Sequence, residues 1–176
     1  MDWYIQWVSN NRLLSAAVQF GILGTLGEIL SLVIRKRKIS SLGNLWQVLG
    51  KILAWALLGV IIKYGFVGMK AFVDGLISQN LLPDWPHGSI GWALMVSVFT
   101  NILFGPQMMF FHRLEENLIM WRWDTSGLKN AWMTLLWFWI PAHTVTFSLP
   151  TDYQIGLAAL WSVALGVILG LSAPRK

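Results

Sequence analysis

The sequence contains no cysteine and few charged residues. Of its 176 residues 12% are charged and 56% are hydrophobic, whereas soluble domains average about 25% charged and roughly 45–50% apolar residues. Without cysteine, thiolate catalysis, iron–sulfur clusters and cysteine-ligated zinc are excluded. So few charged side chains cannot cover the surface of a water-soluble globule of this size. The composition therefore predicts an integral membrane protein and argues against a soluble enzyme.

Long apolar segments recur along the chain. A bilayer core of about 30 Å needs about 20 apolar residues to be crossed by a helix. The predicted spans cover residues 13–34, 45–77, 90–111, 131–149 and 155–171. They leave no room for a second domain, so the fold class expected is all-α: a polytopic membrane helix bundle of about five transmembrane helices in one domain, 1–176.

Basic residues are distributed unequally between the two sides of this five-span arrangement. Arg12 is alone on one side. Ten basic residues are expected on the other side: Arg35, Lys36, Arg37, Lys38, Lys51, Arg113, Arg122, Lys129, Arg175 and Lys176. The positive-inside rule then places the C-terminus on the cytoplasmic or matrix side. Because topology accounts for most of the net charge of +5, we expect membrane lipids and no nucleic acid as partners.

Small residues are spaced for close helix packing. Gly21, Gly24 and Gly27 form a strip along the first predicted span, and Gly166 and Gly170 form a GxxxG pattern in the last. Helices in lipid approach one another closely where small residues lie between their backbones. We expect the GxxxG pattern to contact either a neighbouring helix or a second copy of the chain.

Two prolines lie near the middle of predicted spans, each with polar neighbours. Pro106 and Pro141 are expected to kink their helices, because proline removes a backbone hydrogen bond. The nearby side chains of Asn101, Gln107 and His143 lie at a similar depth. They are expected either to line a wet cavity or to join the two helices.

Four ionisable residues fall inside the first two predicted spans. Lys63, Lys70 and Asp74 share one face of the second helix, and Glu28 lies in the first. In the structural interpretation Lys70 pairs with Asp74 and Lys63 either extends to the interface or meets Glu28. In the functional interpretation these residues line a polar path suited to small anionic solutes, because charges at membrane depth mark functional sites.

Motifs for catalysis or metal binding are absent from the sequence. His87, His112 and His143 fall in different segments, and no HExxH, P-loop or nucleophile-elbow pattern occurs. Glu115 and Glu116 beside His112 are expected to solvate the end of a helix. We therefore predict no enzyme activity, no metal and no cofactor.

Three stretches carry a family likeness. They are the N-terminal segment with Tyr4, Gly21, Leu23, Leu26 and Gly27-Glu28; the central Thr100-Asn101 and Gly105-Pro106; and the C-terminal Trp137, Trp139, Pro141-Ala142, Phe147, Pro150, Tyr153 and Trp161. In these stretches the chain resembles a divergent member of the Mpv-seventeen / peroxisomal membrane protein family. Glu28 stands where that family usually has Asp, and Thr100-Asn101 where it has Asp-Gln.

The resemblance implies a poorly selective pore for small solutes in the mitochondrial inner or peroxisomal membrane, usually described with four spans. A bacterial inner membrane is the other location considered. The function expected is therefore a membrane pore or carrier for a small solute. One alternative is a membrane assembly or scaffold protein without transport. Another is a Trp-rich membrane protein that binds a ligand, since the chain has 12 tryptophans.

Overall fold

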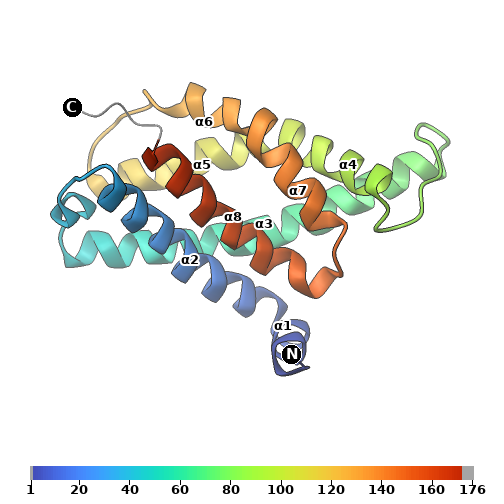
Figure 1. The fold of residues 1–176 in the computed structure, drawn as a ribbon, viewed down its shortest axis with the longest axis horizontal. Helices are drawn as coiled ribbons and strands as arrows, with labels where there is room; N and C mark the ends of the chain where they lie inside the picture. Colours follow the sequence, from blue (N-terminus) through green and yellow to red (C-terminus); the bar gives the residue numbers. More distant parts are fainter. Residues whose placement is uncertain (1, 172–176) are drawn as a thin grey trace.

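The chain folds as an all-α helix bundle, as its composition predicts (Figure 1). The computed structural model describes residues 2–171, apart from the side chains at 169 and 170. The segments in chain order are α1 (Asp2–Asn10), α2 (Arg12–Ile34), η1 (Ile39–Leu42), α3 (Leu45–Ser78), α4 (Ile90–Phe99), η2 (Thr100–Phe104), α5 (Gly105–Met120), α6 (Leu128–Thr134), η3 (Leu135–Trp139), α7 (Ile140–Phe147) and α8 (Thr151–Leu171). The predicted contact of Gly170 and the basic pair Arg175-Lys176 lie outside the described residues.

Within residues 2–171, four helices are long and apolar enough to cross a membrane. They are Arg12–Ile34, Leu45–Ser78, Ile90–Met120 and Thr151–Ile168. The chain is therefore an integral membrane protein. The predicted span 131–149 is not among the four: its residues form α6, η3 and α7, where three tryptophans, Pro141 and His143 lower the apolarity. The prediction of five spans thus exceeds by one the number that length and apolarity support.

Side-chain caps set where two of the long helices begin. At the start of α3 the Gln47 backbone N–H donates to the Asn44 side chain, and the Asn44 N–H donates to the Gln47 side chain. This reciprocal capping box satisfies two backbone donors that the first helical turn leaves free. At α4 the Ser89 hydroxyl accepts from the Trp92 N–H in the same way.

The helices α2, α3 and α8 pack closely because glycines lie between them. α2 packs mainly against α3 and α8, and α4 packs against α7. A Cβ on Gly166 would lie 2.7 Å from the carbonyl oxygen of Gly27, and a Cβ on Gly24 would collide with the Trp55 indole. Gly21 likewise lies against the backbone of α3. Gly166 is thus covered by α2 of its own chain, which removes it from the surface predicted for a second copy.

Gly59 lies close to the backbone of α2, and its replacement tests this packing. A Cβ there would lie 2.5 Å from the Ala16 carbonyl oxygen, whereas a Cβ on Gly68, on the same helix, would meet nothing within 4 Å. We expect Gly59→Ala to destabilise the protein by about 1–3 kcal/mol, the usual cost of overpacking. Gly68→Ala should be neutral or stabilising, since alanine favours the helix by about 1 kcal/mol. Thermal unfolding in detergent micelles measures both, and equal midpoints would contradict this close packing.

Two π-helical segments interrupt the helices in the middle of the bundle. η2 precedes Gly105-Pro106 and η3 precedes Ile140-Pro141, so each proline lies in the first turn of the helix that follows. A proline breaks the regular hydrogen-bond ladder, and π turns occur where that ladder is disturbed. The two π segments contact each other. The two wider π turns therefore lie side by side, at the depth of the polar residues Asn101 and His143.

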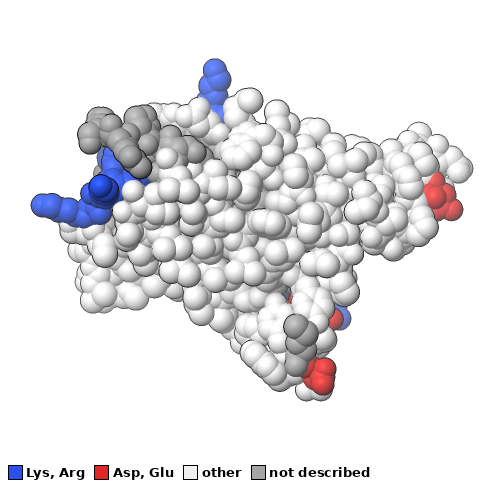
Figure 2. Space-filling model, in the orientation of Figure 1, with Lys and Arg blue, Asp and Glu red and all other residues white. Residues whose placement is uncertain are grey.

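Charged residues gather at the ends of the molecule. Figure 2 shows Lys and Arg mainly at the end where α2 joins α3 and Asp and Glu at other tips, with a broad uncharged surface between them. Such a surface suits contact with lipid chains. Among the ten basic residues expected on the cytoplasmic or matrix side, Lys51 lies in α3 and is only 7% exposed, and Arg113 lies in α5. Both belong to the cluster described next.

Candidate functional site

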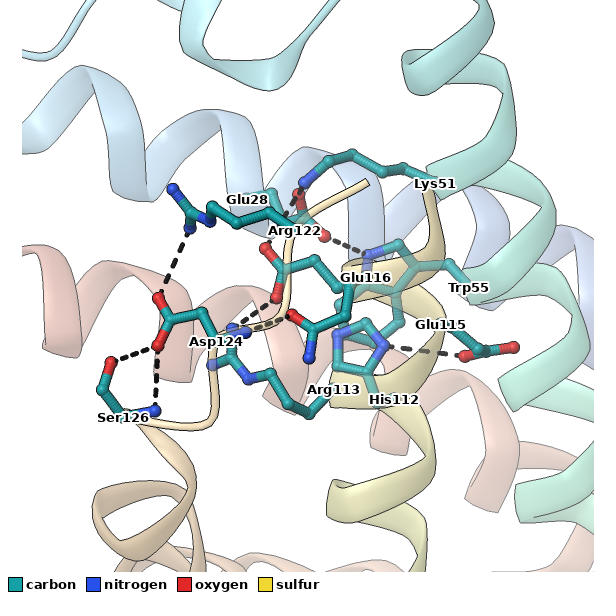
Figure 3. Close-up of polar contacts among 11 residues, drawn as sticks. Glu28, Lys51, Trp55, His112, Arg113, Glu115, Glu116, Arg122, Asp124 and Ser126 are labelled. Carbon is teal, nitrogen blue, oxygen red and sulfur yellow. Dashed lines mark hydrogen bonds and ion pairs between the residues drawn. The ribbon is translucent and has the colours of Figure 1, made fainter. Parts of the chain in front are cut away.

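A cluster of charged side chains lies where α2, α3 and α5 meet (Figure 3). Lys51 Nζ lies 2.7 Å from Glu28 Oε2, and Trp55 Nε1 donates to Glu28 Oε1 at 2.8 Å. Lys51 Nζ also lies 3.8 Å from Glu116 Oε1, while Arg113 pairs with Glu116 Oε2 at 2.7 Å. We call these five residues the charge cluster. Two acids and two bases alternate along it, so it holds charged groups with no net formal charge.

Glu28 takes a partner other than the one considered from the sequence. Lys63 was the lysine expected to meet it, but Lys51 occupies that position. From the sequence, Lys51 is counted among the basic residues on the cytoplasmic or matrix side, because it lies near the start of the second predicted span. The structure buries it instead, and the carboxylates of Glu28 and Glu116 compensate for its lost hydration.

His112 and Glu115 lie beside the charge cluster. The His112 ring centroid is 4.5 Å from that of Trp55, and His112 Nδ1 is 3.8 Å from Glu115 Oε2. Neither of these two buried atoms has a hydrogen-bond partner within the described part of the chain. Among residues 2–171 no three His, Asp or Glu side chains are grouped to hold a metal ion.

The loop after α5 is ordered by Asp124. Its Oδ1 accepts hydrogen bonds from the hydroxyl and the backbone N–H of Ser126, and these lower the pKa of the Asp124 carboxyl (Figure 3). The Asp124 N–H in turn donates to the side chain of Asn117 on α5. These bonds fix the loop beside the charge cluster.

A cavity of about 270 Å³ lies inside the bundle, and we call it the inner cavity. Glu28 and His112 line it near the charge cluster, and Asn101 and His143 line it near the π segments. Asn101 and His112 are eleven residues apart on one continuous helix, which is about 16 Å along its axis. Much of the remaining lining is aromatic or contains sulfur, and includes Phe20, Trp55, Phe66, Phe104, Met108 and Trp139. An apolar cavity with a few polar groups is typical of a small-molecule site.

Asn101, His143 and Trp139 form the polar centre of the inner cavity. Asn101 Nδ2 lies 3.2 Å from His143 Nδ1 and donates to the Ser97 carbonyl at 2.8 Å. The Trp139 ring lies against the imidazole, with centroids 5.0 Å apart. Asn101 is 2% exposed and Trp139 8%, yet Asn101 Oδ1 and Trp139 Nε1 have no hydrogen-bond partner among the described residues. Buried polar atoms are nearly always paired, so these two need an explanation.

A second hollow of about 540 Å³ lies at the opposite end of the bundle, between α3, α4, α7 and α8, and we call it the outer hollow. Lys70 and Asp74 both line it, but each takes a partner from elsewhere in the chain. Lys70 Nζ donates to Gln154 Oε1 at 3.0 Å, and Asp74 accepts from Trp92 Nε1 at 2.8 Å. His87 Nε2 lies 3.5 Å from the same Asp74 oxygen. The direct Lys70–Asp74 ion pair expected from their spacing is not among the ion pairs of residues 2–171.

Two phenylalanines stand between the inner cavity and the outer hollow. Phe66 lines the inner cavity and Phe147 lines the outer hollow, and their ring centroids are 4.7 Å apart. Phe147 is fully buried and Phe66 is 3% exposed. The two spaces are thus separated by a wall about one aromatic pair thick. We call this pair the phenylalanine wall.

Two residues predicted for a polar path line neither space. Gln107 is exposed on α5, where its amide donates to the Leu103 carbonyl. Lys63 is buried, and Arg12, Asp152 and Lys70 are among the charged residues near it. Of the predicted path residues, the structure places Glu28, Asn101 and His143 on the inner cavity, and Lys70 and Asp74 on the outer hollow.

Sequence reasoning missed Lys51 and the aromatic residues of the site. Trp139 and Phe147 enter the sequence analysis only through the family likeness, and nothing in the spacing of Trp55 or Phe66 distinguishes them from other aromatic residues in the helices. Lys51 could have been found, because a carboxylate at membrane depth requires a cationic partner nearby.

The chain has no recognised relative in three comparisons. No family model, curated protein or solved structure matches it.

Proposed function

We propose that the protein is a gated pore or a carrier for small solutes, with its path through the interior of the bundle. The observation that carries the proposal is the end-to-end order of charge cluster, inner cavity, phenylalanine wall and outer hollow. Packed interiors leave few voids larger than a water molecule, so a cavity of about 270 Å³ inside the bundle is unusual. The wall between them makes this a closed state of the path.

The two ends of the path offer polar partners to a solute that leaves water. The charge cluster lies at one end, and Lys70, Asp74 and Gln154 line the other. Side chains that replace hydration in this way are how pores and carriers lower the barrier to passage. Lys70 shares the outer hollow with Asp74, so its charge alone does not favour anions. The preference for anions stays a prediction, tested below with two solutes.

The likeness to the Mpv-seventeen family supports the same proposal. Its members are described as pores with four spans, and four helices here are long and apolar enough to cross a membrane. In this proposal the protein lies in the mitochondrial inner or the peroxisomal membrane, or in a bacterial inner membrane if the likeness fails. The basic end faces the cytoplasm or matrix.

Two amide residues on the same helix test the path. Asn101 lines the inner cavity and Gln107 faces outward, so Asn101→Leu and Gln107→Leu remove the same group inside and outside the path. We expect Asn101→Leu to reduce flux roughly tenfold, because a hydrogen bond that replaces hydration is lost. Gln107→Leu should leave flux unchanged. Osmotic swelling of proteoliposomes in glycerol, and in potassium lactate with valinomycin, measures neutral and anionic flux separately.

The outcomes separate transport from other roles. Equal flux in both variants and the parent would remove the inner cavity from the path. A parent protein that is folded but shows no flux with either solute, and that co-purifies with one fixed partner, would favour the assembly or scaffold function instead. Thermal unfolding of each variant in micelles controls for loss of fold.

A further inference from the structure

We infer that the inner cavity selects small neutral molecules with an apolar body and a hydroxyl-like head group, held by Asn101 Oδ1 and Trp139 Nε1. The inference rests on the proposed function, because it names the class of solute for the same path. Its basis is the pair of buried polar atoms that have no partner among the described residues. Both residues line the cavity, and both lie against the imidazole of His143.

The hydrogen bonds already made determine what these two atoms can accept or donate. With His143 in the tautomer whose Nδ1 accepts, Asn101 uses its N–H groups toward the Ser97 carbonyl and His143 Nδ1, so its carbonyl oxygen remains as an acceptor. The Trp139 indole N–H can only donate. The cavity therefore presents one acceptor and one donor beside a single ring.

A hydroxyl is the head group that satisfies both atoms. It donates its hydrogen to Asn101 Oδ1 and accepts from Trp139 Nε1, whereas an ammonium group cannot accept from the indole. A carboxylate cannot donate to Asn101 and would place its charge against the amide oxygen. Among the described residues that line the cavity there is no Lys or Arg to compensate an anion for its lost hydration. The cavity thus favours a neutral head group.

The size and lining of the inner cavity determine the body of the molecule. An engineered protein cavity of about 150 Å³ binds benzene, and the inner cavity holds about 270 Å³. That is space for a body of about two fused aromatic rings. Trp55, Phe104 and Met108 on the cavity surface offer aromatic and sulfur contacts to such a body.

The test compares 2-naphthol with naphthalene, which share the body and differ in the hydroxyl. Binding to the purified full-length chain in detergent micelles is measured by calorimetry. We expect 2-naphthol to bind about tenfold more tightly than naphthalene, since its hydroxyl pairs two buried atoms. Asn101→Leu and Trp139→Phe should each abolish this preference. Gln107→Leu and Trp137→Phe are matched controls on exposed positions and should retain it.

Equal affinity for the two probes in the parent protein would overturn the inference, as would a preference that survives both cavity variants. Partition into micelles is common to all variants, so it cannot mimic the expected difference between them. Selective 2-naphthol binding in a protein without solute flux would contradict the proposed function but leave this inference intact. Flux that falls in Asn101→Leu, together with equal affinity of the parent protein for the two probes, would contradict the inference but leave the proposed function intact.

Discussion

Glu28→Gln is expected to lower the free energy of unfolding by about 3–5 kcal/mol, the cost of leaving a buried charge without its partner. Lys51 is 7% exposed, and its closest carboxylate oxygen is Glu28 Oε2 at 2.7 Å. Glu116 is farther away, at 3.8 Å, and is already paired with Arg113. Chemical unfolding in detergent micelles measures the loss.

The double variant Glu28→Gln/Lys51→Met is the informative companion. It removes both charges, so we expect much of the lost stability to return, because replacing a whole buried pair is often neutral. Asp124→Asn breaks an exposed pair with Arg122 and should change stability far less. A double variant as unstable as Glu28→Gln would show that the cost does not come from the unpaired lysine.

Phe147→Ala is expected to join the inner cavity to the outer hollow. The side chain is fully buried against Phe66, and its removal takes away half of the phenylalanine wall. We expect flux to rise roughly tenfold, which corresponds to about 1.4 kcal/mol in the barrier to passage. The same truncation should cost about 3–5 kcal/mol of stability, as is usual for a buried phenylalanine. Swelling of proteoliposomes in glycerol measures the first effect, and thermal unfolding the second.

Phe110→Ala is the matched control for this experiment. Phe110 lies on α5 and is 50% exposed, so its truncation leaves the wall intact. We expect parent-like flux and a small change in stability. Flux that stays at the parent level in folded Phe147→Ala protein would exclude the wall as the barrier, and Phe66→Ala offers an independent test from the other side of it.

Hydropathy predicted the class of the fold and the extent of its long helices. The predicted span 45–77 is reproduced by α3, although Lys63, Lys70 and Asp74 make it the most highly charged of the five. Lys70 and Asp74 are accommodated in this helix because each takes a hydrogen-bond partner from a neighbouring helix, Gln154 for Lys70 and Trp92 for Asp74. The span 131–149 is less apolar than the other four, because three tryptophans, Pro141 and His143 lie within it.

Simple helix geometry could have predicted Lys51 as the partner of Glu28. α2 and α3 form an antiparallel pair, so residues equally distant from their connection lie at the same level. Glu28 is six residues before the end of α2 and Lys51 is six residues after the start of α3. The same rule brings Gly24 to Trp55, and the structure shows that contact. Hydrophobic patterning within a single helix contains no such information.

The position of Gln107 was not predictable from regular helical spacing. Thr100 and Gln107 are seven residues apart, which in an α-helix would place them on one face. The π segment η2 lies between them and changes the angle per residue, so Thr100 lines the inner cavity while Gln107 faces outward. The site of such a segment depends on how η2 packs against η3, which is a tertiary property.

Two lysines of α3, Lys51 and Lys70, are separated by about the thickness of the hydrocarbon core of a membrane. Lys51 and Lys70 are nineteen residues apart on one helix, a distance of about 28 Å that nearly equals the hydrocarbon thickness of about 30 Å. When Lys51 lies at one headgroup boundary, Lys70 therefore lies at the other. The whole of α3, with 34 residues, is about 51 Å long, so it must tilt or project beyond the lipid. A solute on the proposed path thus meets charged groups at the two depths where it exchanges water for protein.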